Sequence, residues 1–109
     1  MHEVKALIRP ERLYDVVQAL HGLPAMPKIT VSTVQGFGRR NDIRAPEAMF
    51  GETTMAKIET VVTDELVERV VDVIQRTAGT GRPGDGKIFV MPVNRAVRIR
   101  SGDAGESVL

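Results

Sequence analysis

Cysteine is absent from this 109-residue chain, so neither a disulfide framework nor a thiolate metal site can form. No apolar run approaches the roughly 20 residues of a membrane-spanning helix, and the first residues lack the apolar core of a signal peptide. An excess of one charge is also missing, because 15 Lys and Arg face 14 Asp and Glu. These absences indicate a cytoplasmic protein with no direct membrane insertion and no bulk attraction to nucleic acid.

Aromatic side chains are few, with one Tyr and three Phe in a chain whose 42% hydrophobic content is ordinary for a globular protein. A chain of this length supplies one domain with a modest core. We therefore expect a single domain over residues 1–109, with association between copies completing its core.

Short apolar or alternating runs predict five strands. These runs cover residues 4–8, 29–34, 58–62, 87–93 and 96–100. Residues 4–20 also lie over residues 58–74 without gaps, and their apolar patterns coincide. Two strand–helix units, each followed by a strand, predict an α+β, ferredoxin-like β-α-β-β-α-β fold with an extra C-terminal strand. Two helices would cover one face of its antiparallel sheet, and another copy of the chain is the simplest cover for the other.

Both helices are predicted by apolar residues at helical spacing. The first begins near Pro10, whose missing N–H costs nothing in a first turn. The second follows Thr63, a residue type suited to the N-cap, and Asp64 and Glu65 suit the positive end of the helix dipole. The expected core stripes are Leu13, Val16, Val17 and Leu20 in the first helix, and Leu66, Val67, Val70, Val71 and Ile74 in the second.

Residues 36–54 show no sustained period and contain Gly, Pro, Asn and Asp, which predicts a long loop. Loops of nearly 20 residues are usually functional or disordered. Its basic residues would form a partner-docking patch or simply keep the loop soluble; they are Arg39, Arg40 and Arg44. Its apolar residues would either dock a partner or pack back on the sheet; they are Met49, Phe50 and Met55.

A second loop, residues 79–86, is rich in glycine and precedes a strand-like run. Exposed backbone N–H groups beside convergent cations suit an anion, most often a phosphate. Arg98 and Arg100, two apart on the last predicted strand, would project from one face of it. The simpler interpretations are a tight turn, a solvated strand face, and a turn-forming role for Asp85.

Catalytic and metal-binding patterns are weak in this chain. The sequence offers no nucleophile–base pair and no paired carboxylates at a credible active site, so we do not expect an enzyme. His2 and His21 are isolated histidines without the ligand spacing of a metal site, so no metal is predicted.

Two C-terminal segments closely resemble the signature of PII signal-transduction proteins, also called nitrogen regulatory protein PII. They are Gly-Asp-Gly-Lys-Ile-Phe-Val at residues 84–90 and Arg-Ile-Arg-Ser-Gly at residues 98–102. Gly-Phe-Gly-Arg at 36–39 resembles the approach to that family's T-loop, and residues 5–10 fit its first strand. The resemblance implies a homotrimer that is no enzyme and binds ATP or ADP between subunits. Its T-loop, about residues 37–55 here, would dock onto a membrane transporter, an enzyme or a regulator.

The resemblance also implies a nucleotide site, residue by residue. The phosphates would be held by Gly84, Asp85, Gly86 and Lys87, with Arg98 and Arg100 reaching a nucleotide shared with a neighbouring subunit. Gly38 and Arg39 would approach from the base of the T-loop. The adenine would lie near Thr30, Gly36 and Val61, and Leu7 would line the pocket.

Three departures from the family pattern alter what is expected. The T-loop has no tyrosine for uridylylation, because the only one, Tyr14, falls on the first helix. Arg40 and Met55 replace the glutamine and lysine that help hold Mg and 2-oxoglutarate, so binding of these two ligands is not predicted. The alternatives left open are a relative linked to metal tolerance or bicarbonate transport, and a nucleotide hydrolase.

Overall fold

The computed structural model describes residues 1–39 and 50–109. The predicted docking residues Arg40, Arg44 and Met49 lie outside this part, as do the side chains of Arg39 and Phe50. The strands are β1 (His2–Ile8), β2 (Thr30–Arg39), β3 (Phe50–Val62) and β4 (Gly86–Pro92). The α-helices are α1 (Leu13–His21) and α2 (Asp64–Ala78), and short 3-10 helices cover Pro10–Arg12 and Glu106–Val108.

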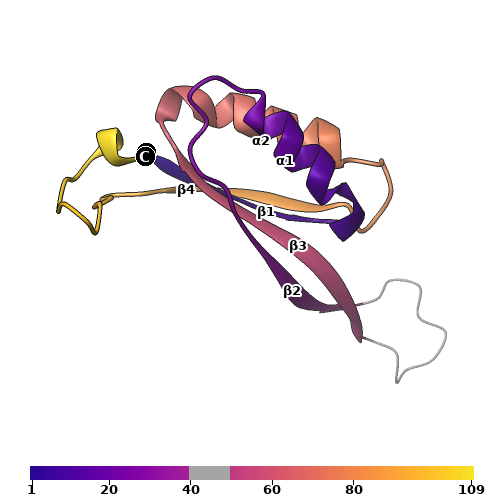
Figure 1. The fold of residues 1–109 in the computed structure, drawn as a ribbon. Helices are drawn as coiled ribbons and strands as arrows, with labels where there is room; N and C mark the ends of the chain where they lie inside the picture. Colours follow the sequence, from indigo (N-terminus) through magenta and orange to yellow (C-terminus); the bar gives the residue numbers. More distant parts are fainter. Residues whose placement is uncertain (40–49) are drawn as a thin grey trace.

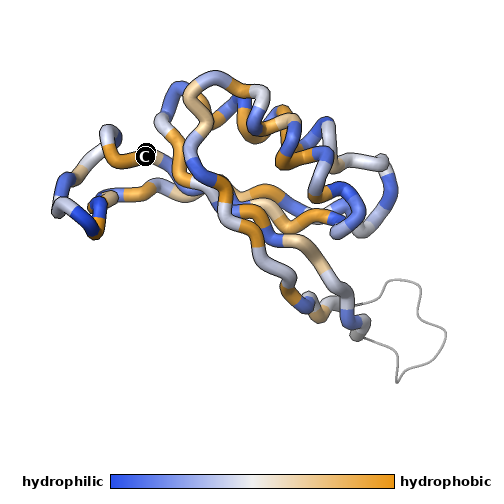
Figure 2. Tube along the Cα trace, in the orientation of Figure 1, coloured by the Kyte–Doolittle hydropathy of each residue, from blue (hydrophilic) through white to orange (hydrophobic). Residues whose placement is uncertain are grey.

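The strands form one antiparallel sheet in the order β2-β3-β1-β4, with both α-helices on one face (Figure 1). This arrangement confirms the ferredoxin-like α+β fold. Its core follows from the period of each element. In β1 every second residue, Val4, Ala6 and Ile8, is buried, because alternate side chains of a strand point to opposite faces. Figure 2 shows apolar segments of the sheet and helices facing each other across this layer.

The helices contribute the stripes that their sequence predicts. Val16 and Leu20 of α1 are fully buried, as are Val70 and Ile74 of α2. Pro10 begins the 3-10 turn that leads directly into α1. Thr63 occupies the N-cap position of α2, as predicted, although its hydroxyl makes no capping hydrogen bond. Tyr14 lies on α1 and is exposed.

Two predicted segments differ from the structure. Much of the expected loop over residues 36–54 is strand, because β2 runs on to Arg39 and β3 begins at Phe50. The expected strand over residues 96–100 is absent, since Val97 forms only a single bridge with Ala104 and Ile99–Ser101 is a turn. The extra C-terminal strand is therefore replaced by a tight reversal, which the backbone N–H of Gly102 closes by donating to the carbonyl of Arg98.

The second face of the sheet carries no helix among the described residues (Figure 1). Charged and apolar side chains alternate there, and partly buried ones such as Glu3, Lys5 and Leu7 lie on β1. The Lys5 ammonium lies 5.6 Å from the ring centre of Phe89 on β4. No helix among the described residues is long and apolar enough to cross a membrane.

Candidate functional site

A cavity of about 540 Å³ opens between the β2–β3 hairpin and the start of β4. It brings together segments that are distant in the sequence, with Leu7 from β1 between the hairpin glycines and the glycine-rich loop. Among the residues expected at the site, its lining includes Leu7, Gly36, Gly38, Gly84, Gly86 and Lys87. Lys87 adds a positive charge to this lining, and the glycines leave backbone exposed, so the cavity suits an anionic group.

Three lining residues outside that expected set are Phe37, Thr53 and Met55. Phe37 is exposed to 72%, although it lies between two glycines that line the cavity. Met55 is partly buried, so the expectation that it packs back on the sheet fits better than an exposed docking role. Together with Leu7, Phe37 and Met55 add apolar residues to the lining, beside Lys87.

The glycine-rich loop has a backbone that few other residues adopt. Gly81, Gly84 and Gly86 have φ values of 82°, 95° and 104°, a region that side chains with a Cβ rarely enter. Gly86 also pairs with Ile8 of β1, and a Cβ there would lie 1.7 Å from the carbonyl oxygen of Leu7. The glycines are therefore needed for the path of the chain at this site.

Asp85 is the centre of the hydrogen bonds within this loop. Its carboxylate accepts from the backbone N–H of Thr80 at 2.7 Å, from that of Gly81 at 2.9 Å, and from the hydroxyl of Thr80. Arg9 donates through Nε to Oδ1 of Asp85 at 3.0 Å and through Nη2 to the carbonyl oxygen of Pro83 at 2.8 Å. The turn-forming interpretation of Asp85 is the one that this geometry favours.

These contacts also govern the ionisation of Asp85. Hydrogen bonds from the Thr80 hydroxyl and N–H, followed by that from Arg9, hold the pKa of its carboxyl well below the usual range. The group is therefore a fixed negative charge at neutral pH. Asp85 does not line the 540 Å³ cavity but a smaller one of about 260 Å³, with Ile8, Ile74 and Ala78.

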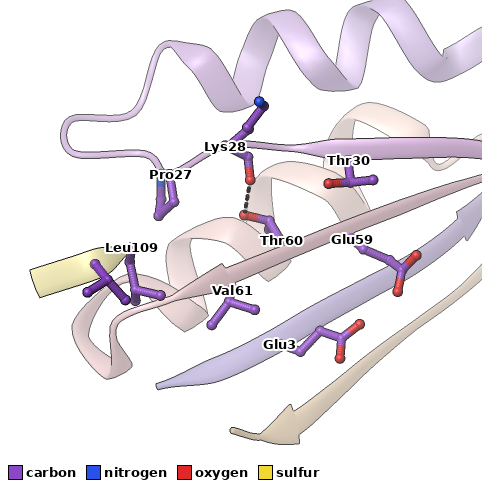
Figure 3. A pocket seen from close by; sticks show the side chains of 9 residues that line it. Glu3, Pro27, Lys28, Thr30, Glu59, Thr60, Val61 and Leu109 are labelled. Atoms are coloured by element: carbon purple, nitrogen blue, oxygen red, sulfur yellow. Dashed lines mark hydrogen bonds between the residues drawn. The ribbon is translucent and has the colours of Figure 1, made fainter. Parts of the chain in front are cut away.

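Thr30 and Val61 lie elsewhere, in a second large cavity of about 450 Å³ (Figure 3). Glu3, Glu59 and the chain end at Leu109 also line it. The hydroxyl of Thr60 donates to the carbonyl oxygen of Lys28 at 3.1 Å and so ties the segment before β2 to β3. Thr30 and Gly36 are six residues apart on one strand, or about 20 Å. The expected adenine set is thus divided between two cavities within one chain.

Arg98 and Arg100 occupy a third location, beyond the end of β4 that is remote from the glycine-rich loop (Figure 1). The expectation that both project from one strand face is wrong, because this segment is a turn. Arg98 donates to Asp103 at 3.4 Å and to the carbonyl oxygen of Ser107 at 3.5 Å. Arg100 is exposed and makes none of the hydrogen bonds or ion pairs found among the described residues.

The histidines have ordinary surroundings. Nδ1 of His2 lies within hydrogen-bond distance of Asp64 Oδ1, at 2.7 Å, and His21 is exposed at the end of α1. Over residues 1–39 and 50–109, no group of three or more His, Cys, Asp and Glu side chains is placed to hold a metal ion.

Sequence reasoning missed Arg9, Phe37 and Met55 as parts of this region or assigned them elsewhere. Arg9 precedes a proline at the end of a strand, where a basic residue is usually just solvated, so its sequence context carried little signal. Phe37 carried more, because a large apolar residue between two glycines of an exposed hairpin has little to pack against within its own strand.

Comparison with known proteins supports the PII resemblance. The family model for Nitrogen regulatory protein P-II matches residues 1–103. Nitrogen regulatory protein P-II from Azospirillum brasilense is 44% identical, with 96% of each chain covered, and that from Klebsiella oxytoca is 42% identical over both full chains. The crystal structure of Arabidopsis thaliana PII bound to citrate has a TM-score of 0.79 at 40% identity, covering 97% of this chain and 89% of that one. The chain therefore belongs to the nitrogen regulatory protein P-II family, whose members are signal-transduction regulators and not enzymes.

Proposed function

We propose that this chain binds an adenine nucleotide, ATP or ADP, in clefts between the subunits of a homotrimer, and thereby controls docking of the β2–β3 hairpin tip onto a partner. The observation that carries the proposal is the 540 Å³ cavity, where Gly84, Gly86 and Lys87 meet the base of the hairpin. The glycine-rich loop offers backbone N–H groups and Lys87 a positive charge to the phosphates.

The division of the remaining residues favours a site shared between copies. Thr30 and Val61 line a separate cavity, and Arg98 and Arg100 lie beyond the opposite end of β4. One nucleotide cannot reach all of them within a single chain. A second copy that presents its Thr30, Val61 and C-terminal arginines to the first chain's glycine-rich loop would complete the site.

The uncovered sheet face supplies a second reason for association. Its partly buried side chains include apolar groups such as Leu7 and Met91. Opposite charges alternate there, with Lys57 Nζ 3.5 Å from Glu59 Oε1. Such a mixed face can pack against its own copy. A homotrimer, as the family resemblance implies, would enclose these three faces around a common axis.

Coupling to a partner follows from the shared strands. Gly36 and Gly38 line the cavity and also belong to β2, whose pairing with β3 continues to the Arg39–Phe50 pair. A ligand that prefers one arrangement of this hairpin base would shift the conformational equilibrium of β2 and β3. We propose a transporter or a cytoplasmic enzyme as the partner, and a cytoplasmic location for the complex.

Calorimetric titration with ATP and ADP, combined with light scattering to measure the mass of the assembly, tests the proposal. Lys87→Ala and Arg100→Ala should each weaken binding while the assembly persists. A charge-assisted hydrogen bond contributes about 1.5–3 kcal/mol, which corresponds to roughly 10- to 150-fold in Kd. Arg95→Ala is the matched control for Arg100, since it removes an exposed arginine from the same segment. Absence of nucleotide binding by the unmodified protein would overturn the proposal.

A further inference from the structure

Arg9 connects the end of β1 to the glycine-rich loop, 76 positions later in the sequence. Its guanidinium uses two donors on two different acceptors, the carboxylate of Asp85 and the carbonyl oxygen of Pro83. We propose that Arg9 is a positioning residue for the anion site: by holding Asp85 and Pro83, it fixes the loop in the form that presents its backbone to an anion. This inference rests on the proposed function.

The first reason is the charge of Asp85. It stands between Gly84 and Gly86, whose backbones line the cavity that would receive the phosphates. A carboxylate turned toward that cavity would repel an anion. Arg9 pairs with it at 3.0 Å, and both side chains are only 23% exposed, so the pair is shielded from solvent. The carboxylate instead lines the smaller cavity, away from the hairpin.

The second reason is the shape of the loop around Arg9. A Cβ on Gly84 would lie 3.2 Å from Nη2 of Arg9, so the guanidinium packs against the loop where the side chain is missing. Gly84 also has φ of 95°, and a loop without supporting contacts can adopt many other backbone conformations. The two hydrogen bonds from Arg9 hold the loop in this one.

A planar fork with fixed geometry is what this role needs. Arginine reaches two acceptors at once, whereas the lysine ammonium is a point charge on a flexible stem. Arg9→Lys should therefore keep the charge near the loop but lose the two-point attachment. The comparison of Arg9→Lys with Arg9→Ala separates positioning from simple attraction of the ligand.

The experiment titrates the full-length protein and its variants with ATP and with inorganic pyrophosphate. Arg9→Ala should weaken both ligands at least tenfold, and Arg9→Lys should recover less than half of that loss on a logarithmic scale. The matched control is Arg12→Ala, which removes a positive charge from the 3-10 turn that follows Arg9. Affinity unchanged in Arg9→Ala, or an equal loss in Arg12→Ala, would overturn the inference. Thermal unfolding checks that each variant is folded.

A double-variant cycle tests whether Arg9 acts through Asp85. If it does, Arg9→Ala combined with Asp85→Asn should weaken binding no more than the larger single effect, because coupled residues are not additive. If the double variant loses affinity by the product of the two single losses, Arg9 contacts the ligand independently of Asp85, and the positioning role would be wrong. If the unmodified protein binds neither probe, the proposed function fails, and exchange of the Thr80 and Gly81 amides still tests Arg9. Exchange should be at least tenfold faster in Arg9→Ala, and equal rates would reject the role.

Discussion

Gly86 and Leu7 approach so closely that a Cβ on the glycine would lie 1.7 Å from the carbonyl oxygen of Leu7. The contact occurs where β4 begins to pair with β1, at the floor of the proposed anion site. Backbone packing therefore requires glycine at this position before any ligand is considered. The same residue links the stability of the fold to the shape of the site.

Gly86→Ala should destabilise the protein by more than about 2 kcal/mol. Strain at a positive φ costs on the order of 1–3 kcal/mol, and the clash with backbone adds to it, since Leu7 cannot move without disturbing β1. Urea unfolding measures the loss. Gly38→Ala is the control, because no atom of the described residues lies within 4 Å of its added Cβ, and it should change stability by less than about 1 kcal/mol. Equal stability of the two variants would contradict the expected clash.

Thr60→Val should cost about 1 kcal/mol of stability. Thr60 is 3% exposed, and its hydroxyl donates to the carbonyl oxygen of Lys28 at 3.1 Å. The variant keeps the side-chain shape but leaves that acceptor without its partner, and a typical hydrogen bond contributes about 0.5–1.5 kcal/mol. The segment before β2 should also exchange its amides faster.

Thr54→Val provides the comparison for that experiment. Thr54 also donates a hydroxyl hydrogen bond, to Gln35 at 3.0 Å, but both residues are exposed. Water can replace the lost partner there, so stability should change by less than about 0.5 kcal/mol. A loss in Thr54→Val as large as that in Thr60→Val would mean that burial does not decide the cost.

Ile74→Ala should be among the most damaging single changes, at about 2–5 kcal/mol. Ile74 is fully buried in α2, within the layer between the helices and β1. Removing it leaves a cavity that close-packed neighbours fill only in part. Tyr14→Ala removes a larger side chain, but this one is 87% exposed, so chemical denaturation should detect little change. A similar loss of stability in Ile74→Ala and Tyr14→Ala would contradict the assignment of Ile74 to the core.

The elements that could be predicted from the sequence are those specified by a local or periodic pattern of residues. Val4, Ala6 and Ile8 alternate as a half-buried strand must, and Val70 and Ile74 recur at the helical period. The order of elements along the chain follows from these periods. The glycine-rich loop was also recognisable, because Gly84 and Gly86 punctuate the run between a helix and a strand.

Residues whose placement depends on distant partners were harder to predict. The segment at Gly36–Gly38 has the composition of a loop, yet it pairs with residues 51–53 of β3, and only that pairing makes it a strand. Arg98 and Arg100 have the spacing of a strand face, but the backbone bond from Gly102 to Arg98 closes a turn instead. Arg9 has no local signal, since Asp85 is 76 positions away.

Glu3 should make stability fall as pH rises above its ordinary pKa of 4.5. Burial, then the hydrogen bond and repulsion from Glu59, raise the pKa of Glu3 in the folded protein. The folded state thus binds its proton more tightly than the unfolded chain, and stability is lost between 4.5 and the raised value as the proton leaves. Glu3→Gln removes this loss. The free energy of unfolding of the variant, measured with urea, minus that of the unmodified protein should therefore be larger at pH 6–7 than at pH 4.

Glu11→Gln is the matched control for this pH dependence, because Glu11 is an exposed carboxylate in the 3-10 turn Pro10–Arg12. The carboxyls of Asp64 and Asp85 have lowered pKa values, so they remove stability as pH falls below their ordinary 3.8. That acid loss is common to all three proteins and cancels in the differences between them. Of the two variants, only Glu3→Gln should change the slope of stability against pH above pH 4.5. Parallel profiles for Glu3→Gln and the unmodified protein would show that ionisation of Glu3 is not coupled to folding.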